Sequence, residues 1–372
     1  MTGEDPDSTG ESGSEDAETG SEASDIAEAL LAGEYRALAR AISMIEDRRP
    51  GYREVVAELH AHAGSAEIIG VTGSPGTGKS TLVDRMAAAY RERDETVGVI
   101  AIDPASPFTG GAVLGDRVRM GSNADDMGVF VRSMSARGTL GGLSAATADA
   151  ITALDAFGKD RIIVETVGAG QNEIDVVRTA DTVCVLLQPK RGDDVQALKA
   201  GILEIADVLV VNKADQDGVD RLVSDLREMI DLGEEAGSHR ITAGVGTPTR
   251  DDRHGERERT DERSGASWTP PIVETVATEG DGVGDLLSAV AGHGAFLDAS
   301  GLRAEKARAR QAEAIRTLLV DDLRELVEAE IESRGGLGDL VDAVASRETD
   351  PYAAVEDLLG PFEDCLKEGR RD

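Results

Sequence analysis

The sequence predicts an α/β protein with a doubly wound, mostly parallel sheet, preceded by a helical extension and followed by a helical arm. Short runs rich in Val and Ile alternate with helical stretches through the middle of the chain. Their apolar character is continuous, as expected for strands that helices cover on both faces. Stretches with a helical period lie on either side of this region.

The first residues differ in composition from everything that follows. Residues 1–24 hold mainly acids, Gly, Ser and Thr and no basic residue, so a disordered acidic tail is expected. Residues 25–64 are expected to form the N-terminal helices, because the pattern turns helical at Ile26. The Pro50-Gly51 pair divides this stretch into separate helices.

Residues 65–300 are expected to form the main domain. Seven apolar runs are predicted to be its strands: 67–72, 97–103, 128–133, 161–166, 181–188, 207–215 and 271–277. Helical segments lie between most of them, which favours parallel pairing. The polar stretch 234–267 is too long for a tight connection and is interpreted as a flexible surface insertion.

Residues 301–372 read as a helical arm. Apolar residues recur there at roughly helical spacing: Ile315, Leu319, Leu323, Leu326 and Ile331. This stripe can pack on the main domain, or it can form the contact of a dimer. The sequence alone leaves both interpretations open.

The charge balance is strongly acidic. The 372-residue chain carries 39 basic and 72 acidic residues, a net charge of −33. Such a surface repels nucleic acid and anionic membranes, so neither is expected as a partner. It suits a halophilic, very salty cytoplasm, where screening removes self-repulsion, although a surface made for a basic partner is the alternative. Two cysteines make no disulfide framework, and no apolar run approaches membrane-span length, so a cytoplasmic protein is expected.

A phosphate-binding loop is the most specific motif. The run "GSPGTGKS" follows an apolar strand and precedes a helix, which is the context that G-x-x-x-x-G-K-[ST] requires. Backbone N–H groups would surround the phosphates, Lys79 would reach the β- and γ-phosphates, and the Ser80 hydroxyl would bind Mg²⁺. The predicted nucleotide-binding residues here are Gly73, Ser74, Pro75, Gly76, Thr77, Gly78, Lys79, Ser80 and Thr81. The sheet is therefore expected to be of the P-loop NTPase kind.

A second motif, "NKAD", closes a later strand and indicates guanine. Asp215 can accept hydrogen bonds from the N1–H and amino group of guanine, which adenine does not offer in that place. Asn212 is expected to tie this loop to the phosphate loop, and the Lys213 stem to cover the base. In "VATEG", the Ala277 N–H is a candidate donor to guanine O6. GTP or GDP is the expected ligand.

Acids at the carboxyl ends of strands are candidates for the metal side of the site. Asp103 and Glu165 end two predicted strands and would face the ligand crevice, where oxygen ligands suit Mg²⁺. Asp116 lies in a glycine-rich loop and taken alone reads as an ordinary loop acid. Gln171 follows the "ETVG" turn and can either orient the attacking water or structure that turn.

Several segments together resemble the MeaB/ArgK family of P-loop GTPases. They are "VTGSPGTGKSTLVD", "AIDPASPFTGGAVLGDRVRM", "RSMSARGTLGG", "VETVGAGQNEIDV", "GDDVQALKAGILEIADVLVVNKAD" and "WTPPIVETVA". The resemblance implies a GTPase that dimerises and acts as a chaperone of adenosylcobalamin-dependent methylmalonyl-CoA mutase or a related acyl-CoA mutase. The 301–372 segment would then be the dimerisation arm of a homodimer.

The resemblance also implies roles for individual residues. Asp103, Asp116 and Glu165 fall on Mg²⁺-site acids, Arg119 falls on a first-switch arginine, and Lys199 lies in a further switch, 188–199. Lys199 is a candidate for stabilising the transition state. Lys190 and Arg191 replace smaller residues of the family in that switch, and Val276-Ala277 replaces the more usual Ser-Ala.

Two other functions are compatible with a nucleotide-binding domain of this type. A GTP-dependent nickel metallochaperone would need a cluster of Cys and His ligands, and the two cysteines and five histidines show no such spacing. A small-molecule kinase would need an acceptor pocket and would have little use for the "NKAD" motif. Both remain alternatives to the mutase chaperone.

Overall fold

The computed structural model describes residues 12–103, 126–135, 142–166, 179–189, 205–235, 267–333 and 335–368. The chain divides into two compact units, Met1–Glu313 and Ala314–Asp372. The first unit holds the sheet and the N-terminal helices, and each unit is considered by itself.

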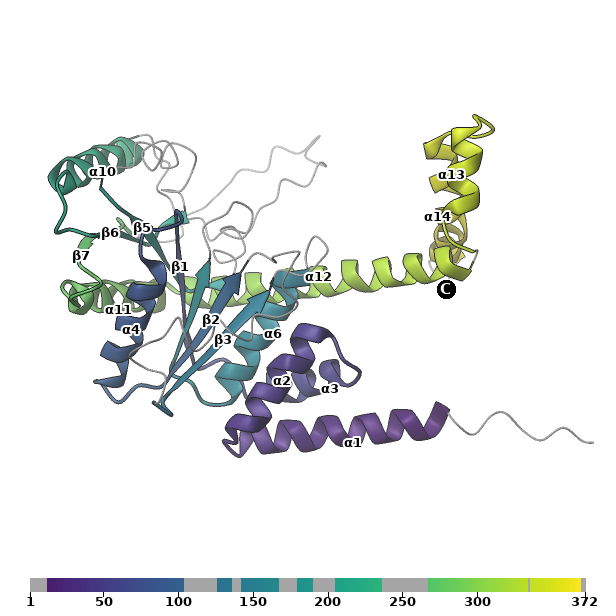
Figure 1. The fold of residues 1–372 in the computed structure, drawn as a ribbon, viewed down its shortest axis with the longest axis horizontal. Coiled ribbons are helices and arrows are strands. Elements are labelled where there is room, and N and C mark those ends of the chain that lie inside the picture. Colours follow the sequence, from purple (N-terminus) through teal and green to yellow (C-terminus); the bar gives the residue numbers. More distant parts are fainter. Residues whose placement is uncertain are drawn as a thin grey trace, which may run out of the picture. The chain divides into compact units, whose positions relative to one another are not determined.

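A seven-stranded sheet forms the centre of the first unit (Figure 1). Its strands are β1 (Glu67–Gly73), β2 (Val97–Asp103), β3 (Val129–Ser135), β4 (Arg161–Thr166), β5 (Thr182–Leu187), β6 (Val208–Asn212) and β7 (Ile272–Thr275). Their order is β3-β2-β4-β1-β5-β6-β7, and every neighbouring pair is parallel. The predicted parallel α/β sheet is confirmed, with all seven strands near their expected positions.

The strand order determines where a ligand can bind. From β1 the chain goes to β2 on one side, and after β4 it returns past β1 to β5 on the other. The connections therefore diverge at the carboxyl end of β1, which in open parallel sheets is the point where ligands bind. The phosphate-loop sequence begins at that end.

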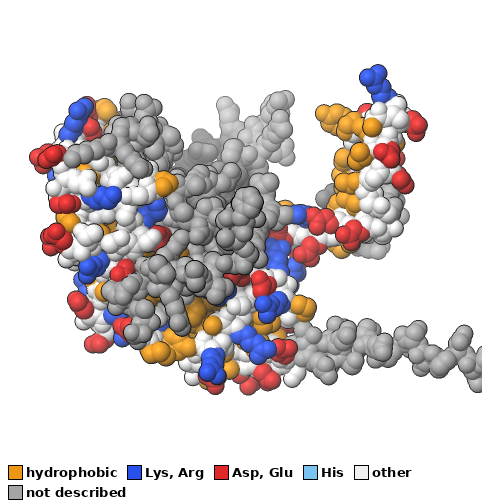
Figure 2. Space-filling model, in the orientation of Figure 1, with side chains coloured by type: hydrophobic (Ala, Val, Ile, Leu, Met, Phe, Trp, Pro, Cys, Tyr) orange, Lys and Arg blue, Asp and Glu red, His pale blue; other side chains and the backbone are white. Residues whose placement is uncertain are grey.

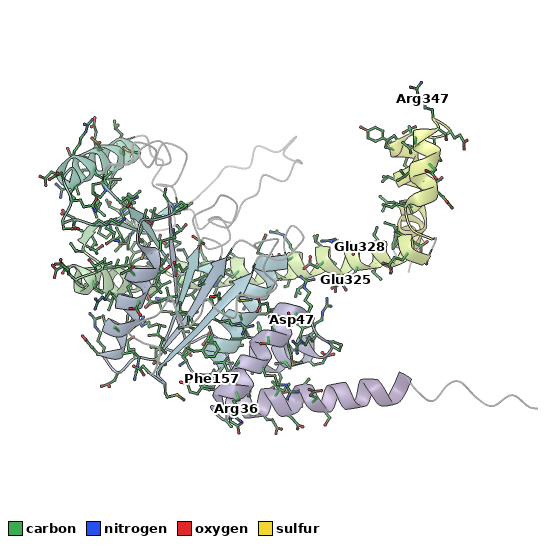
Figure 3. The ribbon with its side chains drawn as sticks, viewed as in Figure 1. Arg36, Asp47, Phe157, Glu325, Glu328 and Arg347 are labelled. Carbon is green, nitrogen blue, oxygen red and sulfur yellow. The ribbon has the colours of Figure 1, made fainter. Side chains whose placement is uncertain are left out.

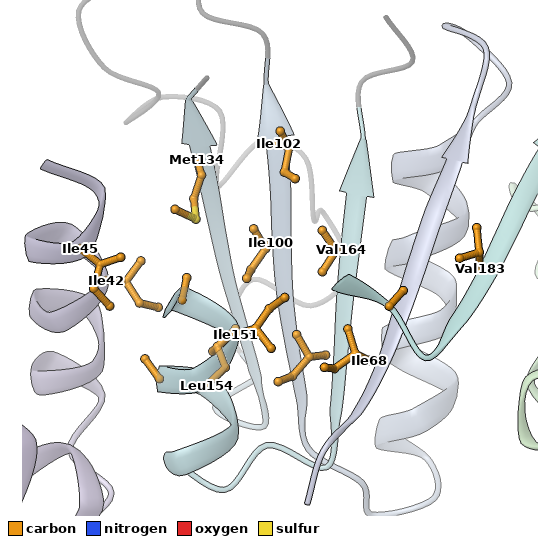
Figure 4. Packing of buried hydrophobic residues seen from close by; sticks show 14 of the residues in the cluster. Ile42, Ile45, Ile68, Ile100, Ile102, Met134, Ile151, Leu154, Val164 and Val183 are labelled. Atoms are coloured by element: carbon orange, nitrogen blue, oxygen red, sulfur yellow. The ribbon is translucent and has the colours of Figure 1, made fainter. Parts of the chain in front are cut away.

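Helices cover both faces of the sheet, because successive side chains of each strand point to opposite faces. Helices α4 (Lys79–Arg91) and α11 (Val283–Ser300) pack on one face around Ile69 and Ile163. Helices α6 (Gly142–Ala156) and α10 (Val219–Glu235) pack on the other face. Figure 4 shows this second core, in which Ile151 and Leu154 of α6 lie against Ile100 and Val164 of the strands.

The N-terminal helices add a further layer over α6. They are α1 (Ser12–Leu31), α2 (Tyr35–Asp47) and α3 (Tyr52–His60), and apolar residues of all three belong to the same core as α6. Ile42 and Ile45 of α2 point toward α6 in Figure 4. Helix α1 begins at Ser12, well before the expected end of the tail at residue 24, and its residues Ala23, Ile26 and Leu30 are buried against α2 and α3.

A buried lysine joins this layer to the sheet. Lys159 is only 2% exposed, and its Nζ donates hydrogen bonds to Tyr35 Oη (3.1 Å) and to the Gly128 carbonyl (3.0 Å). The Nζ also lies 5.0 Å from the ring centre of Tyr35, which packs edge-on against Phe157, labelled in Figure 3. Burial lowers the pKa of Lys159 to about 8.

Polar side chains gather at the amino ends of the strands, opposite the carboxyl ends where the phosphate loop lies. This amino-edge cluster consists of Asp181, Thr182, Asp207, His293, Lys306 and Arg310. Asp181 accepts hydrogen bonds from the Ile68 N–H (3.0 Å) and Arg310 Nη1 (2.6 Å), and Lys306 Nζ donates to the Asp181 carbonyl (2.7 Å). The cluster therefore holds the start of α12 (Leu302–Ser333) against the strands.

His293 lies inside this cluster, between Thr182 and Asp207. It is fully buried, its Nδ1 lies 2.8 Å from Thr182 Oγ1, and its Nε2 lies 3.3 Å from Asp207 Oδ1. Burial, and then the positive charges of Lys306 and Arg303, lower the pKa of His293 to about 3. Burial also raises the pKa of Asp207.

The second unit contains the rest of α12 with α13 (Gly338–Ala345) and α14 (Pro351–Glu368). Apolar side chains gather along α13 and α14 in Figure 2, whereas Glu325 and Glu328 project from α12 in Figure 3. Large apolar side chains are exposed across this unit: Ile315, Leu318, Leu319, Val320, Leu323, Leu326, Leu337, Val341, Tyr352, Val355 and Leu359. Among the helices that the structure describes, none is both long and apolar enough to cross a membrane.

Candidate nucleotide-binding site

The phosphate loop lies between β1 and α4, at the carboxyl end of the central strand. Two of its glycines have positive φ angles and no room for a side chain. A Cβ on Gly73 (φ 143°) would lie 2.3 Å from the Leu186 carbonyl oxygen, and one on Gly78 (φ 96°) would lie 2.4 Å from Asn212 Nδ2. The phosphate loop therefore requires glycine where it passes close to β5 and to Asn212 of the "NKAD" segment (residues 212–215, the base loop).

Lys79 is the first residue of α4, and its charged group lies inside the loop. Its Nζ donates hydrogen bonds to the carbonyl oxygens of Gly73 (2.7 Å) and Ser74 (3.0 Å), and the residue is 6% exposed. Thr77 Oγ1 donates to the Ser74 carbonyl at 2.9 Å. A positive side chain and a helix N-terminus thus converge on one loop, an arrangement that suits a polyphosphate.

Ser80 and Glu165 meet across the strands. Ser80 Oγ donates a 2.5 Å hydrogen bond to Glu165 Oε1, and Glu165 is 5% exposed. Glu165 lies on β4 in register with Val71 of β1, so the sheet itself brings the carboxylate to the loop. A hydroxyl and a carboxylate in contact are hard oxygen donors, and they fit the Mg²⁺ predicted here.

The described residues supply only part of a metal site. Among them, no group of three or more His, Cys, Asp or Glu side chains is placed to hold a metal ion. Asp103 ends β2 in register with Ser135, but its side chain lies outside the described part of the structure. Wholly outside it lie Asp116, Arg119, Gln171 and Lys199, together with the switch residues Lys190 and Arg191. Their roles remain predictions.

Asn212 joins three segments of the site through one buried amide. Its Nδ2 donates to the Thr77 carbonyl of the phosphate loop at 2.7 Å. Its Oδ1 accepts from Thr275 Oγ1 and from the Ala277 N–H, each at 3.1 Å. The expected connection between the "NKAD" motif and the phosphate loop is present. The Ala277 N–H, expected at guanine O6, is bonded to Asn212.

Lys213 and Asp215 occupy the turn after β6. Lys213 has a φ of 62°, and its Nζ donates to the Gly76 carbonyl and to Gln188 Oε1, both at 2.8 Å. The Lys213 stem therefore extends from the turn after β6 to the phosphate loop at Gly76. Asp215 is exposed, as a carboxylate must be to receive a base from solvent.

Two contacts of the site were not predicted from the sequence. Gln188 follows β5 and binds Lys213. Arg85 of α4 donates to the carbonyls of Ala277 (3.2 Å) and Thr278 (2.7 Å), so it fixes the loop after β7. Gln188 is the first residue of the 188–199 switch that the family resemblance indicates, but its contact with Lys213 was not predicted, and Arg85 belongs to no motif. The helical position of Arg85, one turn after the phosphate loop, is the only signal that could have indicated it.

Comparisons with known proteins agree with this geometry. The family model described as "Methylmalonyl Co-A mutase-associated GTPase MeaB" matches residues 38–332. A Pyrococcus abyssi relative, named as a GTPase, is 43% identical over 335 residues, which cover 90% of this chain and 95% of the relative. The Caenorhabditis elegans protein "Methylmalonic aciduria type A homolog, mitochondrial" is 37% identical over 203 residues, covering 50% of this chain and 51% of that protein.

A solved structure shares the fold. The crystal structure of an LAO/AO transport system kinase has a TM-score of 0.59 and 23% identity, with 92% of this chain and 97% of that chain covered. The family match spans most of the chain, including the phosphate loop, the Glu165 strand and the "NKAD" turn. The protein therefore belongs to the MeaB family of P-loop GTPases.

Proposed function

We propose that this GTPase binds GTP and GDP with Mg²⁺ and serves as a chaperone of adenosylcobalamin-dependent methylmalonyl-CoA mutase or a related acyl-CoA mutase. The observation that carries the nucleotide assignment is the amide of Asn212, which connects the base loop to the phosphate loop. The partner assignment is supported by the description of the matching family and by the name of the worm relative. Delivery or repair of the cobalamin cofactor would then depend on the nucleotide state.

Hydrolysis would proceed by in-line attack of water on the γ-phosphate, a reaction that depends mainly on positioning and charge neutralisation. Lys79 would leave the Gly73 and Ser74 carbonyls to contact the phosphates. Bound Mg²⁺ would neutralise phosphate charge, held by Ser80 and by Glu165, Asp103 and Asp116 directly or through water. We assign the remaining candidate roles to Gln171 (water), Arg119 and Lys199 (transition-state charge), which fits slow hydrolysis until a partner docks.

Nucleotide selectivity provides the first test. GTP should bind at least about a hundredfold more tightly than ATP in high salt, because adenine would leave Asp215 unpaired. Equal affinity for GTP and ATP would contradict the guanine assignment.

Lys79 provides a test of the phosphate loop. Lys79→Ala should abolish hydrolysis, whereas Arg308→Ala, an exposed change on α12, should not alter it.

Glu165 provides a test of the metal side. Glu165→Ala should reduce Mg²⁺-dependent hydrolysis about 10- to 100-fold while changing GTP affinity much less, because the carboxylate acts beside Ser80 rather than on the base. Single-turnover hydrolysis across a Mg²⁺ titration, together with GTP binding at saturating Mg²⁺, measures both quantities. Loss of binding with retained hydrolysis would refute this role.

The partner can be identified by capture from native extract. The tagged chain loaded with a non-hydrolysable GTP analogue should recover a cobalamin-dependent acyl-CoA mutase, and the GDP-loaded chain should recover a different amount. Recovery of a hydrogenase or urease maturation complex without a mutase would favour a nickel metallochaperone. GTP-dependent phosphorylation of a small molecule would favour a kinase.

We also propose that the protein is a homodimer whose contact lies on the second unit. Its exposed apolar residues include Leu319 (58% exposed) and Leu323 (48%), one turn apart on α12. A contiguous apolar surface of this kind is typical of a subunit contact. Light scattering should give a dimer for the native chain and a monomer for Leu319→Glu/Leu323→Glu. The control Leu232→Glu, an exposed site on α10 (58%), should remain dimeric.

A further inference from the structure

Gln188 is placed between the two nucleotide-binding loops by the order of the strands. It directly follows β5, which lies between β1 and β6. Gly73, which begins the phosphate loop, is in register with Leu186, and Val211, which precedes the "NKAD" asparagine, is in register with Leu187. Gln188 is therefore the next side chain at the junction of both loops, and it is 7% exposed.

The amide of Gln188 contacts the ammonium of the base-loop lysine. Gln188 Oε1 accepts a 2.8 Å hydrogen bond from Lys213 Nζ, and the same Nζ donates at 2.8 Å to the Gly76 carbonyl. Lys213 leaves its backbone from a left-handed conformation (φ 62°), which limits the directions available to its stem. Two acceptors, one in the phosphate loop and one at the end of β5, therefore hold one ammonium in a defined place.

We propose that Gln188 is a positioning residue for guanine nucleotide binding: by holding the Lys213 ammonium, it keeps the lysine stem over the base and slows nucleotide release. This inference rests on the proposed guanine site. It assigns Gln188 no contact with the nucleotide, because its Oε1 is directed to Lys213. The hydrogen bond between Lys213 and Gln188 also connects the end of β5 directly to the base loop.

The proposal predicts an effect on release rather than on chemistry. Gln188→Leu preserves size but removes the acceptor, so the ammonium retains only the Gly76 carbonyl and the stem gains freedom. Release of a fluorescent GDP analogue, chased with excess GDP, should become about tenfold faster, in line with the loss of one hydrogen bond to a charged group. Single-turnover hydrolysis of preloaded GTP should change by a smaller factor than release does.

A double-mutant cycle tests whether Gln188 acts through Lys213. Lys213→Met keeps an unbranched stem and removes the ammonium. Gln188→Leu should speed release in the native background and have no further effect in the Lys213→Met background, because coupled residues are not additive. Gln188→Glu keeps an acceptor and should restore slow release. Gln311→Leu, an exposed change on α12, is the matched control and should release GDP at the native rate.

The outcomes separate this inference from the proposed function. If the native chain binds no guanine nucleotide, the guanine site itself fails. If it binds GDP but Gln188→Leu leaves release unchanged, or speeds it equally in both backgrounds, the guanine site stands and the role of Gln188 is overturned. A lower melting temperature with unchanged release would likewise reduce Gln188 to a packing role.

Discussion

At the scale of single residues, recognition of guanine would depend on Asp215 and its neighbours. Asp215 is exposed in the turn after β6, while Asn212, which ends β6, and Lys213, which follows it, are bonded to the phosphate loop. Two of the three side chains therefore fix the turn, and the third, Asp215, would contact the base in the proposed complex. A change at Asp215 should alter selectivity without displacing the loop.

Asp215→Asn should change the preferred base from guanine to xanthine. The asparagine amide can donate to the xanthine O2 while its oxygen accepts from N1–H, whereas guanine presents a donor at both positions. GTP affinity should fall about a hundredfold or more, and affinity for XTP should rise above it. Competition binding of both nucleotides measures this exchange. Asp217→Asn, an exposed change in the same turn, is the control and should keep the preference for GTP.

His293 should make the free energy of unfolding depend on pH. Its pKa is about 3 in the fold and about 6.5 in an unfolded chain, so between these values the unfolded chain binds the extra proton. The stability due to neutral His293 is complete above about pH 6.5 and decreases toward pH 3, by up to about 1.4 kcal/mol per pH unit. His293→Gln should flatten the decrease in melting temperature between about pH 6 and pH 4, and the exposed His60→Gln should not. Parallel curves for native and His293→Gln chains would contradict this.

At the scale of elements, the amino-edge cluster anchors the start of α12 to β5 and β6. Arg310 and Lys306 both reach Asp181, which also accepts the Ile68 N–H of β1. Asp181 is 2% exposed, so a charge left there without its partner is costly. The start of α12 is thus fixed to the sheet by charged hydrogen bonds.

Arg310→Met should destabilise the fold by about 2 kcal/mol, because it removes one charged hydrogen bond from a buried carboxylate that keeps its backbone donor and the ion pair with Arg303 at 3.7 Å. The urea midpoint of unfolding, followed by circular dichroism, measures the loss. Arg308→Met is the matched control, since Arg308 is exposed on the same helix and should shift the midpoint little. Similar shifts for both variants would show that the cluster adds no stability of its own.

At the scale of the whole molecule, a net charge of −33 should make stability depend on salt. Raising the KCl concentration from about 0.1 M to about 1 M shortens the screening length from about 10 Å to about 3 Å and weakens repulsion among surface acids. The melting temperature should therefore rise steeply over this range. Sucrose at matched osmolality should raise it less, and an equal rise would indicate that charge screening is not the cause.

Much of the fold follows from the sequence, and some of its contacts do not. The sheet could be predicted because its strands are continuous Val and Ile runs, and the two loops because their motifs are contiguous. The start of α1 could not, since the polar residues before Ala23 give no signal of the packing that follows. The contacts of Gln188 and Arg85 could not either, because the first arises only from the strand order and the second from the position of α4.

The bonding of Asn212 has a calorimetric consequence. Both ends of its amide are engaged within the protein, so the base loop, the phosphate loop and the turn after β7 already hold one another before a nucleotide arrives. A preorganised loop loses little conformational entropy on binding. The favourable enthalpy of guanine binding should therefore appear almost fully in the binding free energy. Little of it should be offset by the entropy cost of ordering the chain.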